Sequence, residues 1–178
     1  MLSFDIRSIE THAIDVEGDL DANDPLWKDG DIRPDAAVHV TGRLHSAGEG
    51  RFYFSGLISG AVSSECRRCL TPVSADVSEE TQVFFADAGT DETGDPDVYV
   101  LDPRTPELDL QPAMREQWLL SAPAWHLCRD DCKGLCPTCG ADLNAGPCSC
   151  AAAADPRWAA LRNAPRNAPP NAQPGAPK

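Results

Sequence analysis

The chain has 178 residues, 42% of them hydrophobic, which is enough to bury one substantial core beside a small appended module. Its formal charge of -13 excludes a general phosphate-backbone binder, because non-specific affinity for nucleic acids comes from lysine and arginine side chains. No apolar run is long enough to span a membrane, and the first residues lack the pattern of a signal or transit peptide, so we expect a cytoplasmic protein.

The first 35 residues predict a short N-terminal strand followed by an acidic loop. Between Asp19 and Asp35, acidic residues are interrupted by Pro25, Gly30 and Pro34, which disfavour regular structure. We expect this loop to be solvated.

Four later segments show the alternation of a strand. Residues 37–47 and 51–62 alternate around a glycine-containing connection, which predicts an antiparallel hairpin. Residues 73–85 predict a third long strand, and residues 97–101 a short fourth one. The acidic stretch 86–96 between them is expected to be a loop without chemistry.

Residues 108–121 change to helical spacing. Met114 and Trp118 recur on one face, Asp109 suits the N-cap and Pro112 suits the first turn. We therefore predict one amphipathic helix whose apolar face enters the core.

Eight cysteines stand in four pairs: Cys66 and Cys69, Cys128 and Cys132, Cys136 and Cys139, Cys148 and Cys150. In a reducing compartment, paired cysteines indicate metal ligands rather than disulfides. A C-x2-C turn lets two thiolates converge on one ion, and a glycine after the second cysteine, as at Gly140, eases that turn. Four thiolates are typical of a closed structural zinc site, so we predict two zinc ions.

The spacing favours one local and one long-range quartet. The local quartet consists of Cys136, Cys139, Cys148 and Cys150, and the long-range quartet of Cys66, Cys69, Cys128 and Cys132. The second grouping would join the end of a long strand to the segment beyond the helix and constrain the unfolded chain. Two alternatives stay open: some cysteines are merely buried and one site is metallated, or the thiolates hold iron-sulfur clusters.

His126 is the one candidate for an open, catalytic metal site. With Asp130 or Asp131 it would suggest a metal-dependent nuclease or other hydrolase, because catalytic zinc keeps a position for water. A lone histidine is more often a packed neighbour, four thiolates leave no such position, and the sequence has no nucleophile or phosphate-binding motif. We predict no catalytic residues, no enzyme activity and no small-molecule substrate.

Four arginines form the one basic concentration in the sequence. Arg67 and Arg68 lie inside the first C-x2-C turn, and Arg43 and Arg51 lie on the preceding strands. Guanidinium groups on a metal-rigidified turn suit phosphate or base contacts, so these four are candidates for RNA contact. The alternative is that they form surface ion pairs with nearby glutamates.

Taken together, several segments resemble the bacterial YceD family. They are residues 65–72 (ECRRCLTP), Asp109-Leu110, residues 132–144 (CKGLCPTCGADLN) and residues 155–161 (DPRWAAL). The resemblance implies a factor in accumulation of 23S ribosomal RNA, with that RNA or a large-subunit assembly protein as partner and no assigned catalysis. The resemblance implies a role for the cysteines only, because the family has no catalytic residues to assign to this chain. Some members lack the second quartet, which implies structural reinforcement by that site.

The predicted fold class is α+β: a mostly antiparallel sheet of about four or five strands, one packed helix and a zinc-ribbon-like C-terminal module. The predicted domains are residues 1–123 with the first C-x2-C, residues 124–163 as a cysteine-rich zinc module with a short helix, and residues 164–178 as a disordered tail. The predicted function is a non-enzymatic ribosome-biogenesis factor for 23S ribosomal RNA, and the alternative is a zinc-scaffolded protein-protein adaptor.

Overall fold

The computed structural model describes residues 2–90, 94–123, 125–150 and 156–158. Contacts divide the chain into two compact units, Met1–Gly134 and Leu135–Lys178. In the described residues, all strands and both α-helices belong to the first unit, and the second has one 3-10 turn, Pro156–Trp158. Apart from this turn, the short helix predicted at the end of the C-terminal module and the predicted tail lie outside the described residues.

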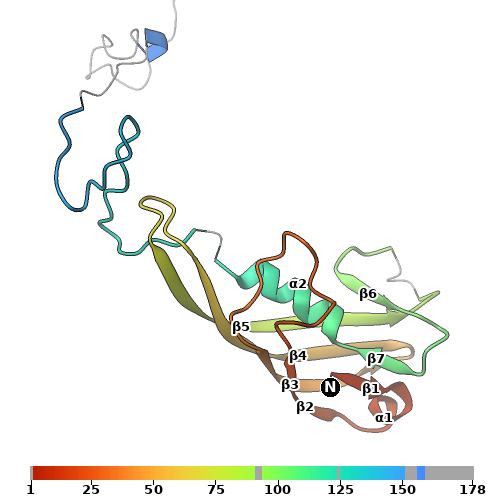
Figure 1. The fold of residues 1–178 in the computed structure, drawn as a ribbon. Helices are drawn as coiled ribbons and strands as arrows, with labels where there is room; N and C mark the ends of the chain where they lie inside the picture. The colour runs from red at the N-terminus through yellow and green to blue at the C-terminus, as the bar shows by residue number, and fades with distance from the viewer. Residues whose placement is uncertain (1, 91–93, 124, 151–155, 159–178) are drawn as a thin grey trace, which may run out of the picture. The chain divides into compact units, whose positions relative to one another are not determined.

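The first unit is built on a five-stranded sheet in the order β2-β3-β4-β5-β6 (Figure 1). The strands are β2 (Ile14–Leu20), β3 (Val38–Gly48), β4 (Arg51–Glu65), β5 (Pro72–Asp87) and β6 (Val98–Leu101). β2 to β5 pair antiparallel, and β6 lies parallel to β5. This architecture confirms the predicted, mostly antiparallel α+β fold.

A small second sheet joins β1 (Ser3–Asp5) to β7 (Glu107–Asp109), and helix α1 (Ile6–Thr11) follows β1 directly. The Asp5 carboxylate caps α1 by accepting hydrogen bonds from the backbone N–H groups of Arg7 and Ser8. The N-terminal strand was expected from the sequence, whereas α1 and β2 were not.

Helix α2 (Gln111–Ser121) lies across one face of the sheet (Figure 1). Its predicted start at residue 108 is wrong, because Leu108 and Asp109 form part of β7. Leu110 occupies the N-cap position without a side-chain cap, and Asp109 instead accepts a hydrogen bond from the backbone N–H of Gln111 at 2.9 Å. Met114 and Trp118 are fully buried, as the helical spacing predicted.

The core lies between α2 and the sheet. Alternate residues of β4 are buried beneath the helix, among them Phe52, Phe54 and Ile58. Burying a side chain of this size contributes roughly 1.5–3 kcal/mol, so this face supplies much of the driving force for folding.

The loop between β2 and β3 is fixed against the core, although its sequence predicted a solvated loop. Trp27 is only 3% exposed. The indole N–H of Trp118 donates to the backbone oxygen of Ile32 at 2.8 Å. Arg115 of α2 makes a two-pronged ion pair with Asp31, at 2.7 and 2.8 Å. These contacts hold the acidic loop beside α2.

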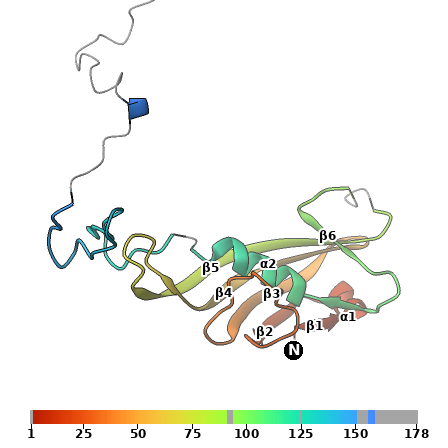
Figure 2. The ribbon, with the colours of Figure 1, turned by 45° about the horizontal axis from the view of Figure 1, so that its top comes forward.

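β4 and β5 continue beyond the rest of the sheet as a two-stranded arm (Figure 2). Pairing between β3 and β4 ends at His39 with Ser59, whereas β4 and β5 stay paired as far as Glu65 with Pro72. Asp35 fastens the side of the arm, because its N–H donates to the oxygen of Ala61 at 2.8 Å. The first C-x2-C turn therefore lies at the tip of the arm. No helix in the described residues is long and apolar enough to cross a membrane.

Candidate metal centres

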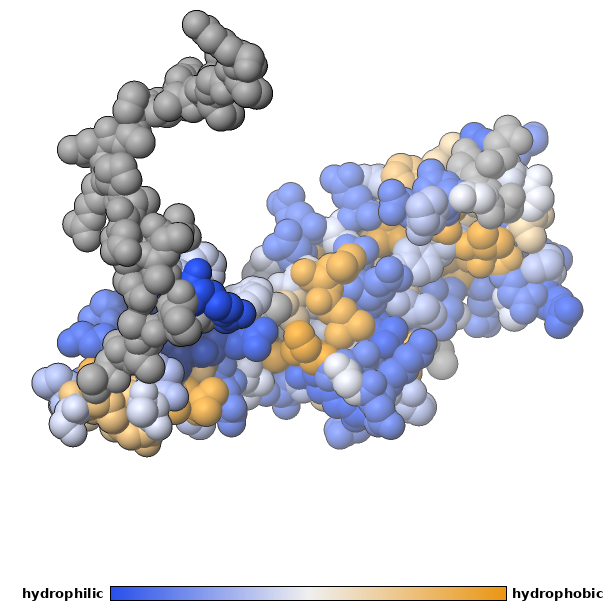
Figure 3. Space-filling model, turned by 90° about the horizontal axis from the view of Figure 1, so that it is seen from above, coloured by the Kyte–Doolittle hydropathy of each residue, from blue (hydrophilic) through white to orange (hydrophobic). Residues whose placement is uncertain are grey.

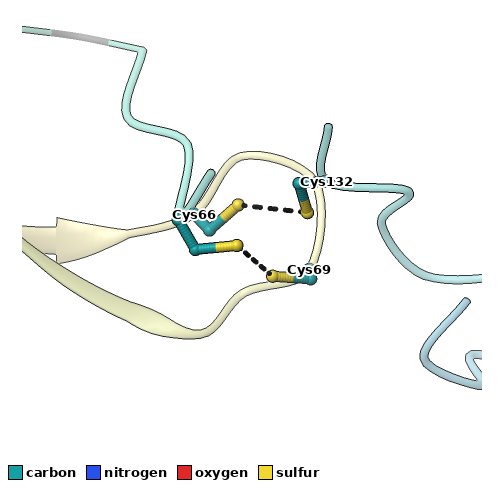
Figure 4. Close-up of side chains that lie close together, drawn as sticks. Cys66, Cys69 and Cys132 are labelled. Atoms are coloured by element: carbon teal, nitrogen blue, oxygen red, sulfur yellow. Dashed lines mark hydrogen bonds between the residues drawn. The ribbon is translucent and has the colours of Figure 1, made fainter. Parts of the chain in front are cut away.

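The tip of the arm carries the first cysteine quartet, which we call centre 1. It consists of Cys66, Cys69, Cys128 and Cys132, whose sulfur atoms all lie within 4.8 Å of one another. The Cys66 and Cys132 sulfurs are 3.8 Å apart, and those of Cys69 and Cys128 are 3.5 Å apart. Figure 4 shows the thiols of the turn pointing at those of the segment that follows α2.

These distances match a metal site rather than disulfides. With a zinc–sulfur bond of about 2.3 Å, the edge of a tetrahedron is about 3.8 Å long. A disulfide needs about 2.05 Å. Centre 1 therefore has the spacing of four thiolates around one ion.

Two backbone hydrogen bonds shape the first turn. The N–H of Cys66 donates to the oxygen of Thr71 at 2.8 Å, and the N–H of Leu70 donates to the oxygen of Cys66 at 2.9 Å. Leu70 adopts the left-handed conformation, with φ of 61°, which costs a non-glycine residue roughly 1–2 kcal/mol. The conformation of the turn that carries both thiols is therefore accompanied by backbone strain at Leu70.

The segment after α2 is hydrogen-bonded to this turn. The N–H of Arg67 donates to the oxygen of His126 at 2.9 Å. The Arg68 guanidinium donates to the oxygens of Cys132, at 2.8 Å, and Asp130, at 3.3 Å. At Gly134 an added Cβ would lie 2.7 Å from the oxygen of Arg68, so only glycine permits this approach. These contacts therefore hold the segment that carries Cys132 against the turn that carries Cys66 and Cys69.

The second quartet, centre 2, lies wholly within the second unit. Cys136, Cys139, Cys148 and Cys150 have sulfur atoms within 4.8 Å of one another. Its turn repeats the hydrogen bonds of the first: the N–H of Cys136 donates to the oxygen of Ala141 at 2.8 Å, and the N–H of Gly140 donates to the oxygen of Cys136 at 2.9 Å. Gly140, with φ of 72°, occupies the position that Leu70 has in centre 1.

Each quartet combines acidic and weakly acidic thiols. Burial raises the pKa of Cys66, but backbone N–H groups around the sulfur outweigh it and lower this pKa to about 6. Backbone N–H groups likewise lower the pKa of Cys136 to about 6. Hydrogen bonding to a neighbouring thiol raises the pKa of Cys128 to about 12 and that of Cys150 to about 11. Binding of an ion must therefore displace the thiol protons of Cys128 and Cys150.

His126 lies beside centre 1 but is not part of it. Its side chain is buried, Nδ1 is hydrogen-bonded to the Ser64 hydroxyl, and Nε2 has no hydrogen-bond partner in the described part of the chain. Asp130 and Asp131 are exposed, and Asp131 pairs with Arg129 at 3.3 Å. Among the described residues, neither quartet includes a histidine or carboxylate, so the geometry gives the hydrolase alternative no support.

The structure divides the four candidate arginines. Arg67 and Arg68 lie at centre 1, whereas Arg51 begins β4 and so stands at the opposite end of that strand from Cys66. Arg43 lies on β3 opposite Ser55, with its side chain 65% exposed and 4.0 Å from the Asp15 carboxylate. The single basic concentration anticipated from the sequence is therefore not formed.

Trp125 is a surface residue that sequence reasoning missed. The guanidinium carbon of Arg67 lies 4.3 Å from the centre of its ring, and the residue is 76% exposed. A lone tryptophan after a helix gives no periodic signal, because only folding shows whether it is buried. Its position beside centre 1 adds an aromatic surface to the two arginines.

The chain matches the family model of YceD, the large ribosomal RNA subunit accumulation protein, over residues 54–163. An uncharacterized protein of Mycobacterium tuberculosis is 37% identical over 123 residues, which cover 67% of this chain and 58% of that protein. An uncharacterized protein of Mycobacterium leprae is 31% identical over 130 residues, covering 71% of this chain and 58% of its own length. The chain thus spans less than two thirds of these relatives. No solved structure matches it significantly.

Proposed function

Because this chain belongs to the YceD family, we propose that it is a non-enzymatic, cytoplasmic ribosome-biogenesis factor that supports the synthesis, processing or stability of 23S ribosomal RNA. The family match is the observation that carries this proposal. It extends over most of the arm, helix α2 and both cysteine quartets. The partner is the RNA itself or a large-subunit assembly protein.

The proposed metal is zinc, with one structural ion in each centre. Four thiolates at tetrahedral spacing suit zinc, and they leave no coordination position for a reacting water molecule. Within the proposal, the ion in centre 1 fixes the arm to the segment after α2 and thereby organises the surface around it. Elemental analysis of the purified protein should give about two zinc per chain and a colourless solution. Iron and visible absorption would show iron-sulfur clusters instead.

Arg67 and Arg68 are the proposed first points of RNA contact. Both side chains are exposed, both belong to the turn of centre 1, and Arg68 is braced by two backbone oxygens. A braced guanidinium loses little conformational entropy when it pairs with a phosphate. Arg43 and Arg51 remain separate candidates on the sheet.

Depletion in a bacterial host tests the function. The expected result is a lower ratio of 23S to 16S ribosomal RNA and fewer assembled large subunits, restored by the wild-type chain. The variant Cys66→Ser should not restore them, because it removes a ligand of centre 1. An unchanged ratio after depletion contradicts the proposal. Crosslinking that recovers a ribosomal protein without RNA would favour the adaptor alternative.

A further inference from the structure

A groove of about 540 Å³ lies beside centre 1, in the first unit. Its lining includes the tip turn, through Glu65, Arg67 and Leu70, the acidic loop, through Arg33, and the segment after α2, through His126. Centre 1 fixes the relative positions of the turn and that last segment, so the groove is a built feature of the fold.

Trp125 lies next to this groove, in contact with the Arg67 side chain that lines it. Trp125 is 76% exposed and Arg67 lines the groove, with the guanidinium carbon 4.3 Å from the centre of the indole ring. Tryptophan is normally well buried, because exposing its ring to water is costly. Leu70, also lining the groove, is 56% exposed. Large hydrophobic residues reach the surface of this chain in separate patches among hydrophilic side chains (Figure 3).

The groove has a mixed lining of polar and apolar side chains, which suits an occupant that has both an apolar face and polar edges. Ser63, Ser64, Glu65 and Arg33 line it, and the buried His126 beside them has a ring nitrogen without a hydrogen-bond partner in the part of the chain that is described. An apolar anchor from another protein would leave these groups desolvated and unpaired. A nucleobase has a π-face for the ring and polar edges for the groove.

The charges favour a nucleic acid at this place in an otherwise acidic chain. Arg33 and Arg67 line the groove, and Arg68, next to Arg67 in the turn, is held by two backbone oxygens. Bases of a duplex are stacked and inaccessible to an exposed ring, whereas unpaired bases can be splayed onto one.

We propose that Trp125 and Arg67, with the groove beside centre 1, bind an unpaired base of single-stranded RNA, the ring stacking on the base and the arginines contacting the flanking phosphates. This inference rests on the proposed function and names its RNA-binding surface.

Binding of fluorescent RNA to the full-length, zinc-loaded protein tests it. The probes are unstructured oligonucleotides of about 12 nucleotides and a duplex of the same length. Trp125→Ala should weaken binding to the single strands by about 5- to 150-fold, the range expected for loss of one stacked base. Trp125→Phe keeps an aromatic face and should retain most of the affinity. Leu120→Ala is the control, because Leu120 is 74% exposed on α2 and does not line the groove.

Three results of the binding assay would overturn the proposal: no binding of single strands by the wild-type chain, equal affinities of wild type and Trp125→Ala, or equal losses in Trp125→Ala and Leu120→Ala. The depletion experiment separates this inference from the proposed function. If the wild-type chain and Trp125→Ala restore 23S RNA equally well, the surface is refuted and the function stands. If depletion leaves 23S RNA unchanged, the function itself fails.

Discussion

Leu70 and Gly140 occupy the same position in two turns with the same hydrogen bonds, yet only one of them is glycine. Both follow the second cysteine of a C-x2-C pair and have φ near +60 to +70°, 61° for Leu70 and 72° for Gly140. A leucine in this conformation is strained, because its Cβ approaches the following carbonyl oxygen. Centre 1 therefore folds against a local cost that centre 2 avoids.

Replacing Leu70 by glycine should relieve this strain. We expect Leu70→Gly to raise the free energy of unfolding by about 1 kcal/mol, since relief of the left-handed conformation exceeds the entropy that glycine adds to the unfolded chain. Leu70→Ala is the control and should bring no gain, because alanine keeps the Cβ. Urea unfolding of the zinc-loaded proteins measures the difference. If the Leu70→Gly protein were less stable than wild type, the inference that Leu70 is strained would be wrong.

At this scale, the sequence predicted what depends on local spacing. The C-x2-C pairs and the glycine after Cys139 indicate ligand turns before any fold is known. The strand predicted over residues 51–62 already begins at Arg51, as β4 does. The exposure of Trp125 depends instead on what α2 leaves uncovered, and no local pattern encodes it.

At the scale of the elements, the alternating pattern of strand β2 is difficult to recognise in the sequence because its exposed positions are acidic. Val16 and Leu20 are buried and alternate with Asp15, Glu17 and Asp19, a period of two that fits a half-buried strand. The acidic composition of the region drew the interpretation toward a loop. Helix α1 has only six residues, too few for a helical period to stand out.

The acidic loop between β2 and β3 is bound to α2 by a titratable contact. The N–H of Lys28 donates to the Asp31 carboxylate, and with Arg115 it holds the pKa of Asp31 below its ordinary value of 3.8 despite partial burial. A lowered pKa in the folded state contributes stability above the unfolded value, and this contribution is lost as the pH falls through the folded value.

Asp31→Asn should therefore destabilise the protein at neutral pH and lose this effect in acid. The difference in unfolding free energy from wild type should stay constant down to about pH 5 and shrink below about pH 4. Denaturant unfolding at several pH values measures it. Asp29→Asn, an exposed neighbour in the same loop, is the control and should show no such trend. If the difference in unfolding free energy between Asp31→Asn and wild type grew as the pH fell, the contact would not be stabilising in the way described.

Gly56 allows β3 and β4 to approach closely at the middle of the sheet. A Cβ at this position would lie 2.2 Å from the backbone oxygen of Thr41 and 2.7 Å from the ring of Phe54. Because a backbone oxygen of a paired strand cannot move aside, Gly56→Ala should destabilise the fold by on the order of 2–4 kcal/mol. Thermal unfolding checks this, with Ser55→Ala expected to change stability by less than about 0.5 kcal/mol. If Gly56→Ala hardly changed the stability of the fold, the two strands would be able to move apart and accommodate the added Cβ.

At the scale of the whole molecule, the two centres act over different lengths of chain. Cys69 and Cys128 of centre 1 are 59 residues apart, so the proposed ion would close a long loop that contains β5, β6 and α2. Centre 2 draws all its thiols from the second unit. The cysteine spacing also predicted that these four thiols join the end of a long strand to the segment beyond the helix, but it did not predict that β4 and β5 extend past the sheet as an arm.

Matched substitutions in the two turns should separate these roles. Cys69→Ser and Cys139→Ser should each lower the zinc content from about two ions to about one. Cys69→Ser should also destabilise the sheet by on the order of 3–5 kcal/mol, the effect of opening a link across a loop of this length. Cys139→Ser should leave the sheet unchanged. Metal analysis and the emission of the buried Trp27 and Trp118 during unfolding measure both effects. Equal destabilisation of the sheet by the two variants would contradict the division.

The long separation of ligands in centre 1 also orders events during synthesis. At 5–20 residues per second, the ribosome adds Cys128 about 3 to 12 seconds after Cys69. Throughout that interval the tip of the arm offers an ion only two thiolates, and the tetrahedron closes once α2 and the segment behind it have been translated. Centre 2 receives all its ligands within a single short stretch. If centre 1 binds the proposed ion, its capture would therefore report that the first unit has been made almost in full.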